Sequence, residues 1–237
     1  MRNFIRSERA VSEALSFLMM MGLLLASGAG IFIVGKPLIE NSQRSVHFLE
    51  MDQSFALLAQ NLDKVGYDRG PLRVTELKEK DGTISIVRES MITIDGIPFS
   101  MGSLEYTYEN KTIAYENGGL WTKYSNGAVI MKGKPRISLG NVTTIPIIEL
   151  MGDASLGGEG LFRVSAKGYS STFTTITPAG GTIQLVIKSN YYRGWASYLS
   201  DEGALDISLD DANQTVYSNI TANTLNIYQN QVLIKIL

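Results

Sequence analysis

The chain has 237 residues, no cysteine, a single histidine and a formal net charge of −2. The lack of cysteine excludes disulfide frameworks, thiolate catalysis and thiolate metal sites. The near-neutral charge gives no general attraction to nucleic acid, so we expect no nucleic-acid partner. The length is sufficient to bury a good core in one domain of ordinary size.

The first predicted element is an apolar helix. The segment from Ala14 to Gly35 contains no charged residue over 22 positions. At about 1.5 Å per residue these positions extend about 33 Å, close to the ~30 Å hydrocarbon core of a bilayer. A soluble core helix would normally show a polar face at helical spacing, and this segment shows none. The sequence therefore predicts that residues 14–35 span a membrane.

The flanking charges predict the orientation of this helix. Arg2, Arg6 and Arg9 precede the apolar segment, and Lys36 and Arg44 follow it. Basic residues are retained preferentially on the cytoplasmic side. We therefore expect a single-pass cell-membrane protein with its N-terminus inside and its C-terminal domain outside.

A secretory signal is the alternative interpretation of the same segment. Ala26-Ser27-Gly28 resembles a small-residue cleavage site. Apolar residues continue directly afterwards, from Ile31 to Val34, and two acidic residues, Glu8 and Glu13, are unusual ahead of a signal's apolar segment. These features favour a retained helix.

The helix is expected to continue beyond the membrane, from residue 11 to residue 65, with Pro37 as a site of bending. Residues 38–65 have apolar positions at three- and four-residue steps, which is typical of an amphipathic helix. Gly66 and the turn residues 68–71 should end it. The apolar positions are Val46, Leu49, Phe55, Leu58, Leu62 and Val65.

Small residues form a pattern within the apolar segment. Gly22, Ala26 and Gly30 are spaced by four and therefore share one helix face. Such a face allows two membrane helices to approach closely. The alternative is that Gly and Ala are simply common in membrane helices.

The N-terminal sequence from Arg6 to Glu13, followed by the apolar segment, resembles the start of archaeal type IV pilin-like proteins. The resemblance implies that residues 1–10 are a basic leader, which a membrane-bound prepilin peptidase would remove between Ala10 and Val11. Glu13 would become the third mature residue, whereas the acidic residue of bacterial pilins is typically the fifth. It would then pair with the new amino group on Val11 of a neighbouring subunit. A simpler interpretation is that Glu13 is favoured at a helix start by the helix dipole.

Two later segments, Tyr115 to Trp121 and Tyr191 to Trp195, resemble stretches of uncharacterised archaeal pilin-like membrane proteins. Tyr191, Tyr192 and Trp195 could form an aromatic binding patch, but packing in a core or an interface is the expectation we favour.

The remainder, residues 72–237, is predicted to be a β-rich extracytoplasmic domain. Short β-branched or alternating segments are separated by turn residues, and Asn117-Gly118-Gly119 and Asn126-Gly127 are strong hairpin signals. The fold class is therefore α+β, a long N-terminal membrane-spanning helix followed by antiparallel sheets, either a sandwich or curled sheets. Strands are expected at 83–87, 91–94, 104–108, 112–115, 143–150, 161–165, 171–177, 182–187, 213–217, 224–228 and 232–236, with a short helix at 191–199.

The residues that catalysis requires are scarce. His47 is the single imidazole, and we expect it on the helix surface near the headgroups. Residues 127–135 have the wrong glycine spacing for a phosphate-binding loop. An acidic stretch lacks the spacing of an EF-hand and is expected to be a solvated surface. We therefore expect no enzyme, no catalytic residue, no cofactor and no metal site. The acidic residues are Asp201, Glu202, Asp206, Asp210 and Asp211.

Candidate glycosylation sites agree with an outer domain. Asn110, Asn141, Asn213 and Asn219 each begin an Asn-X-Thr sequence. The leading hypothesis is a structural pilin-like subunit of an archaeal surface filament or envelope assembly, which polymerises through its N-terminal helix with copies of itself or other pilin-like subunits. The alternative is a monomeric membrane-anchored adhesion or ligand-binding protein.

Overall fold

The computed structural model describes residues 4–79, 81–152, 154–178 and 180–237. The chain divides into two compact units, Met1–Leu49 and Glu50–Leu237. The first consists of the N-terminal part of one helix. The second holds the rest of that helix and all of the sheets.

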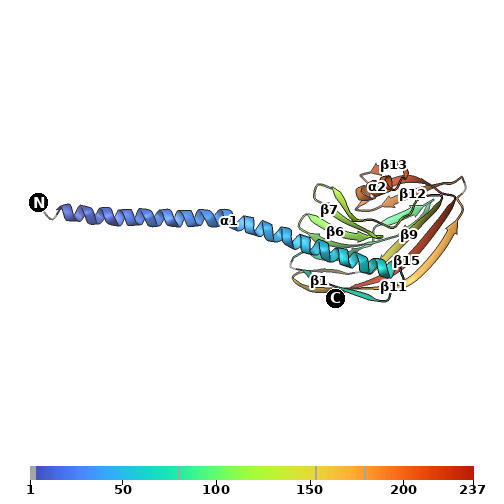
Figure 1. The fold of residues 1–237 in the computed structure, drawn as a ribbon, viewed down its shortest axis with the longest axis horizontal. Helices are drawn as coiled ribbons and strands as arrows, with labels where there is room; N and C mark the ends of the chain where they lie inside the picture. Colours follow the sequence, from blue (N-terminus) through green and yellow to red (C-terminus); the bar gives the residue numbers. More distant parts are fainter. Residues whose placement is uncertain (1–3, 80, 153, 179) are drawn as a thin grey trace. The chain divides into compact units, whose positions relative to one another are not determined.

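The long helix is α1, which runs from Phe4 to Gly66 and contains Pro37 without interruption (Figure 1). The predicted long apolar helix is thus confirmed, and it ends at the expected glycine. Two of the apolar positions predicted to be buried in residues 38–65 are not buried, because the side chains of Val46 and Leu49 are 51% and 58% exposed. In the second unit the buried positions of α1 recur at steps of four and three: Met51, Phe55, Leu58, Leu62 and Val65. This spacing is that of one continuous helix face.

Three sheets form the β-rich part of the second unit. The first has the order β1-β11-β15-β9, formed by Arg73–Glu79, Gly160–Ile176, Thr224–Ile236 and Val142–Met151. The second has the order β10-β2-β5-β6-β7-β8, formed by Ser155–Gly157, Thr83–Val87, Ser103–Tyr108, Lys111–Glu116, Gly119–Tyr124 and Val129–Gly133. The third has the order β13-β14-β12-β3-β4, formed by Leu205–Asp210, Thr215–Thr221, Thr182–Lys188, Met91–Ile94 and Ile97–Ser100.

The strand pattern confirms a β-rich domain with largely antiparallel pairing. Six strands, β1, β4, β7, β8, β10 and β13, lie outside the strand ranges that the sequence predicted. The extent and pairing of the strands differ from expectation in three further places. Residues 161–165 and 171–177, predicted as two strands, belong mainly to the single strand β11. Likewise, 224–228 and 232–236 are both parts of β15. The third difference is that β15 pairs with β9 in parallel, which a sequence of hairpins does not predict.

Turn chemistry explains two tight hairpins, one predicted at Asn117-Gly118 and one at Asp95-Gly96 that was not predicted. Asn117 and Gly118, between β6 and β7, have φ angles of 46° and 80°. Asp95 and Gly96, between β3 and β4, have 49° and 80°. Two successive positive φ angles define the type I′ turn, whose twist matches that of the flanking strands.

The main core combines buried residues from all three sheets with residues of the helix α2, Tyr192–Asp201. This is the short helix predicted at 191–199. Trp121 from β7 and Trp195 from α2 are both fully buried, and their ring centroids are 5.3 Å apart. Aromatic rings at this separation add to the energy of area burial.

Candidate functional site

The most prominent functional feature is the apolar surface of α1. One segment of this helix is long and apolar enough to cross a membrane. All described side chains from 12 to 34 are exposed, and Leu23, Phe32 and Ile33 are each at least 67% exposed. A contiguous apolar surface of this size marks a site of interaction with a membrane or with another protein. This part of α1 therefore has the length, composition and exposure of a membrane-spanning segment.

The small residues predicted for assembly share one face of this segment. At about 100° per residue, Gly22, Ala26 and Gly30 lie within about 80° of one another around the helix axis. A methyl group added at Gly22 or Gly30 would meet nothing within 4 Å. The same is true of Gly28, which lies about 200° from Ala26 and thus on the opposite side. Both faces are sterically open, and only the predicted face has the regular four-residue spacing.

The processing residues lie at the start of the helix. The bond between Ala10 and Val11 lies within α1, and the side chains of these two residues fall outside the described set. Glu13 is exposed, one residue before the apolar segment begins. The structure therefore brings Glu13, Gly22, Ala26 and Gly30 together only as parts of one helix.

The two segments on which the later family resemblance rests pack against each other. Glu116, in the first, accepts a 2.6 Å hydrogen bond from Nε1 of Trp195, in the second. A Cβ atom built on Gly194 would lie only 2.7 Å from the ring of Trp121, so glycine is needed for this close approach. Tyr191 and Trp195 are 1% and 0% exposed. The aromatic cluster is thus core packing rather than a binding patch.

Glu116 is the centre of a buried polar cluster that sequence reasoning missed. Its Oε1 also accepts a 2.6 Å hydrogen bond from the Ser189 hydroxyl, which in turn accepts one from the backbone N–H of Tyr191. Burial raises the pKa of Glu116 to about 7, against the opposing effect of these hydrogen bonds. The adjoining cavity has a volume of about 30 Å³, about one water molecule's share of liquid volume and far below the size of a substrate pocket. This cluster joins β6 to α2.

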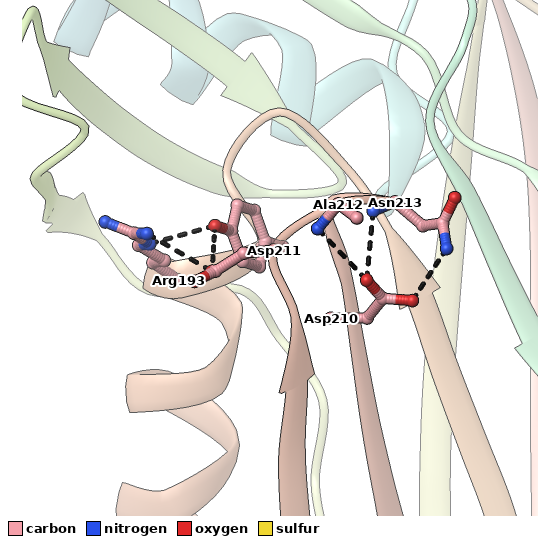
Figure 2. A network of polar contacts seen from close by, with 6 residues as sticks. Arg193, Asp210, Asp211, Ala212 and Asn213 are labelled. Atoms are coloured by element: carbon pink, nitrogen blue, oxygen red, sulfur yellow. Dashed lines mark hydrogen bonds and ion pairs between the residues drawn. The ribbon is translucent and has the colours of Figure 1, made fainter.

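Two residues of the acidic stretch, Asp210 and Asp211, accept local hydrogen bonds, as Figure 2 shows. The carboxylate of Asp210 accepts from the backbone N–H groups of Ala212 and Asn213 and from the Asn213 amide. Asp211 accepts from Tyr192 and from Arg193, at 3.2 Å in the second case. Among the described residues, no group of three or more His, Asp or Glu side chains could hold a metal ion.

A larger cavity, of about 360 Å³, lies between the end of α1 and the strands β11 and β15. Arg69 and Lys167 contribute cationic side chains, and Tyr169 contributes an aromatic ring that is 71% exposed. Serine hydroxyls and the amides of Asn230 and Gln231 add polar groups, and Val65, Pro71 and Leu72 add an apolar part of the lining. Such groups can bind anionic or hydroxyl-rich molecules. Sequence reasoning missed this site because its residues come from three separate segments.

The remaining predicted residues lie on or near strand ends. Asn110 is exposed in the turn between β5 and β6, and Asn141 is exposed just before β9. The side-chain amides of Asn213 and Asn219 donate to Asp210 and Asp206, at 2.7 and 2.9 Å. His47 is only 5% exposed, so the expected position on the helix surface is wrong.

Comparison with known proteins gives one archaeal relative and a family. The chain is 23% identical over 228 residues to an uncharacterised protein of Archaeoglobus fulgidus, with 71% of this chain and 74% of the relative covered. No solved structure matches the chain. A family model matches residues 9–235, which include the apolar part of α1 and almost all of the β-rich domain. The chain therefore belongs to the family of unknown function DUF7289.

Proposed function

We propose that this protein is a membrane-anchored, pilin-like structural subunit that assembles through its N-terminal helix into a surface filament or envelope assembly. The observation that carries the proposal is the exposed apolar surface of residues 14–34, within the uncharged segment 14–35. A bilayer can cover this surface in the single subunit. After assembly, the same surface can be covered by equivalent helices of neighbouring subunits, which is how a pilin-like helix would leave the lipid.

The small-residue face supports close packing of such helices. Gly22, Ala26 and Gly30 have no side chain larger than a methyl group. Two helix backbones can therefore approach closely enough for favourable van der Waals contact. The carboxylate of Glu13 adds a polar contribution at the edge of the apolar segment. An unpaired carboxylate that enters lipid is costly, so a neighbour's amino group on Val11 would stabilise it.

Matched glycine substitutions test the packing face. Gly22→Leu and Gly28→Leu add the same side chain and keep the helix equally apolar, but they project from different faces. We expect Gly22→Leu, and likewise Ala26→Leu, to insert into the membrane and to reduce oligomer or filament yield. Gly28→Leu should insert and assemble like the wild type. Equal assembly of all variants would contradict the shared-helix mechanism.

The substitution Glu13→Gln tests separately whether the carboxylate of Glu13 stabilises the assembly. It removes the charge and retains the shape and the ability to accept a hydrogen bond. We expect normal membrane insertion with impaired assembly, measured by electron microscopy of sheared cell-surface material. If Glu13 serves only as a favourable charge near the helix start, assembly should be unchanged.

The second candidate function is a monomeric membrane-anchored adhesion or ligand-binding protein, and the cavity of about 360 Å³ favours it. Its lining by Arg69, Lys167 and amide side chains suits an anionic or hydroxyl-rich ligand. Wild-type membranes that yield only monomers in cross-linking experiments would make this function the better explanation.

The proposal places residues 72–237 outside the cell and includes glycosylation of asparagines in this domain. Asn110 and Asn141 are the strongest candidates, because both side chains are exposed. The amides of Asn213 and Asn219 are held by aspartates. Glycopeptide mass spectrometry of native protein should find occupancy first at Asn110 and Asn141.

A further inference from the structure

The second half of strand β11 has a free edge. β1 pairs with β11 only from Gly160 to Ala166, whereas β15 pairs with β11 from Val164 to Ile176. From Gly168 onward, therefore, β11 is hydrogen-bonded to named strands on one side only. The register shifts between Gly168 and Ser170. Figure 1 shows β11, in orange, along the outside of its sheet.

This half-strand also lacks cover on its two faces. All residues from Gly168 to Thr175 are exposed, although side chains of a β-strand point alternately to opposite faces. Phe173 stacks on Tyr228 of β15 at 4.4 Å between ring centroids, and the two rings remain 51% and 39% exposed. The segment thus presents unpaired backbone groups together with an exposed aromatic pair.

The free edge is unprotected, in contrast to the edges formed by the other described strands. Exposed edges are normally guarded by charged residues, by proline or by short length, since an unguarded edge is a template for another strand. Residues 168–176 contain no charged residue and no proline, and six of the nine are Ser, Thr or Phe. The other edge strands carry such guards: Arg73 and Lys78 in β1, Pro146 and Glu149 in β9, Lys132 in β8, Asp206 and Asp210 in β13, Pro98 in β4, and only three residues in β10.

We propose that the free edge of β11, residues 168–176, pairs with the same edge of a second copy of this chain. The pairing is antiparallel and two-fold symmetric, so each copy presents the same surface. A segment without charge meets no like-charge repulsion when it faces itself. Opposed Ser, Thr and aromatic side chains form favourable cross-strand pairs. Anchored copies also share one membrane, which supplies the partner at high local concentration.

This interface is separate from helix packing, and its test keeps the two apart. The chain has no cysteine, so single cysteines placed in the full-length, membrane-embedded protein give an unambiguous disulfide cross-link. Two-fold antiparallel pairing brings one central residue close to its own copy. We therefore expect strong cross-linking at one of three exposed positions on one strand face, Ser170→Cys, Thr172→Cys or Thr174→Cys.

Matched controls come from β12, an interior strand of the third sheet. Gln184→Cys and Lys188→Cys replace exposed residues on one face of β12. There β14 pairs with one side of β12, while on the other side β3 pairs with Lys188 and the backbone N–H of Asp95 donates to the Gln184 carbonyl. Each cysteine is tested with and without Gly22→Leu, which disrupts helix packing. We expect the β11 cross-link to persist with Gly22→Leu. Cross-linking on β11 that does not exceed that on β12 would overturn the proposal. Wild-type amounts of filament from the Gly22→Leu protein would contradict only the helix mechanism.

Charge placed on the edge provides an independent test. In the Gly22→Leu background, Thr172→Lys with Thr174→Lys should abolish co-purification of two differently tagged copies in detergent. Thr182→Lys with Gln184→Lys should leave it unchanged. Mixing the β11 lysine variant with Thr172→Glu and Thr174→Glu should restore co-purification, because opposite charges then face each other. If the β11 lysine variant co-purifies as well as its parent, the proposal is wrong.

Discussion

The carboxylate of Glu116, at the end of β6, lies 2.6 Å from the indole Nε1 of Trp195 in α2 and accepts its hydrogen bond. Both residues are almost completely buried. An ionised carboxylate at this depth loses its hydration, and the hydrogen bonds from Ser189 and Trp195 offset that loss only in part. The pKa near 7 is the consequence.

This pKa predicts how stability depends on pH. The folded protein binds the Glu116 proton more tightly than the unfolded chain, whose pKa stays near 4.5. The contribution of Glu116 to folding stability should therefore increase as the pH falls from about 7 to about 4.5, by on the order of 3 kcal/mol. Above pH 7 it should be constant. Denaturant unfolding of the full chain in detergent, measured across this range, checks the prediction.

Glu116→Gln should remove this pH dependence. The amide oxygen can still accept hydrogen bonds from Ser189 and Trp195, and no charge is buried at any pH. Glu159→Gln is the matched control, because Glu159 is exposed. We expect the control to retain the wild-type pH profile. A Glu116→Gln profile that parallels the wild type would show that another group causes the dependence.

Gly118→Ala should destabilise the second unit more than Gly96→Ala. Both glycines have φ of 80° in equivalent hairpin turns. A Cβ atom would meet nothing within 4 Å at Gly96, but at Gly118 it would lie 2.2 Å from the Tyr67 hydroxyl oxygen. The strain of positive φ, about 1 to 2 kcal/mol, is common to both, and overpacking should add about 1 to 3 kcal/mol at Gly118 alone. Chemical denaturation of both variants measures the difference, and equal losses would contradict the packing argument.

Native protein should begin at Val11. The reason is the basic segment that ends at Ala10, directly before the apolar part of α1. Mass spectrometry of protein isolated from native membranes identifies the terminus. An intact Met1 terminus on all molecules would exclude leader processing, and a start near Ala29 would instead support a secretory signal.

The domain from Leu72 to Leu237 should be digested when protease is added to intact cells. The physical basis is the excess of arginine before the apolar segment, which retains the N-terminus in the cytoplasm. A cytoplasmic marker protein should remain intact in the same sample. Protection of the domain until the cells are lysed would reverse the topology.

The sequence by itself determined the elements whose signals are local. The end of the apolar helix at Gly66 and the strands at Thr83–Val87 and Met91–Ile94 were predicted with the bounds that the structure has, or nearly so, whereas the helix begins at Phe4 instead of residue 11. Turn residues such as Asn117 and Gly118 fix a backbone conformation within a few positions. The spacing of Gly22, Ala26 and Gly30 along α1 likewise places them on one face of the helix.

Tertiary structure alone decided which distant segments meet. No local signal relates Glu116 to Trp195, which are 79 positions apart, or makes β9 and β15 parallel neighbours. The sequence suggested two strands where β11 continues through the irregularity at Gly168, because an interrupted pattern does not show whether pairing with β15 persists. The free edge arises for the same reason: β1 ends its pairing at Ala166, and only the arrangement of all four strands reveals that the backbone groups beyond it have no neighbouring strand.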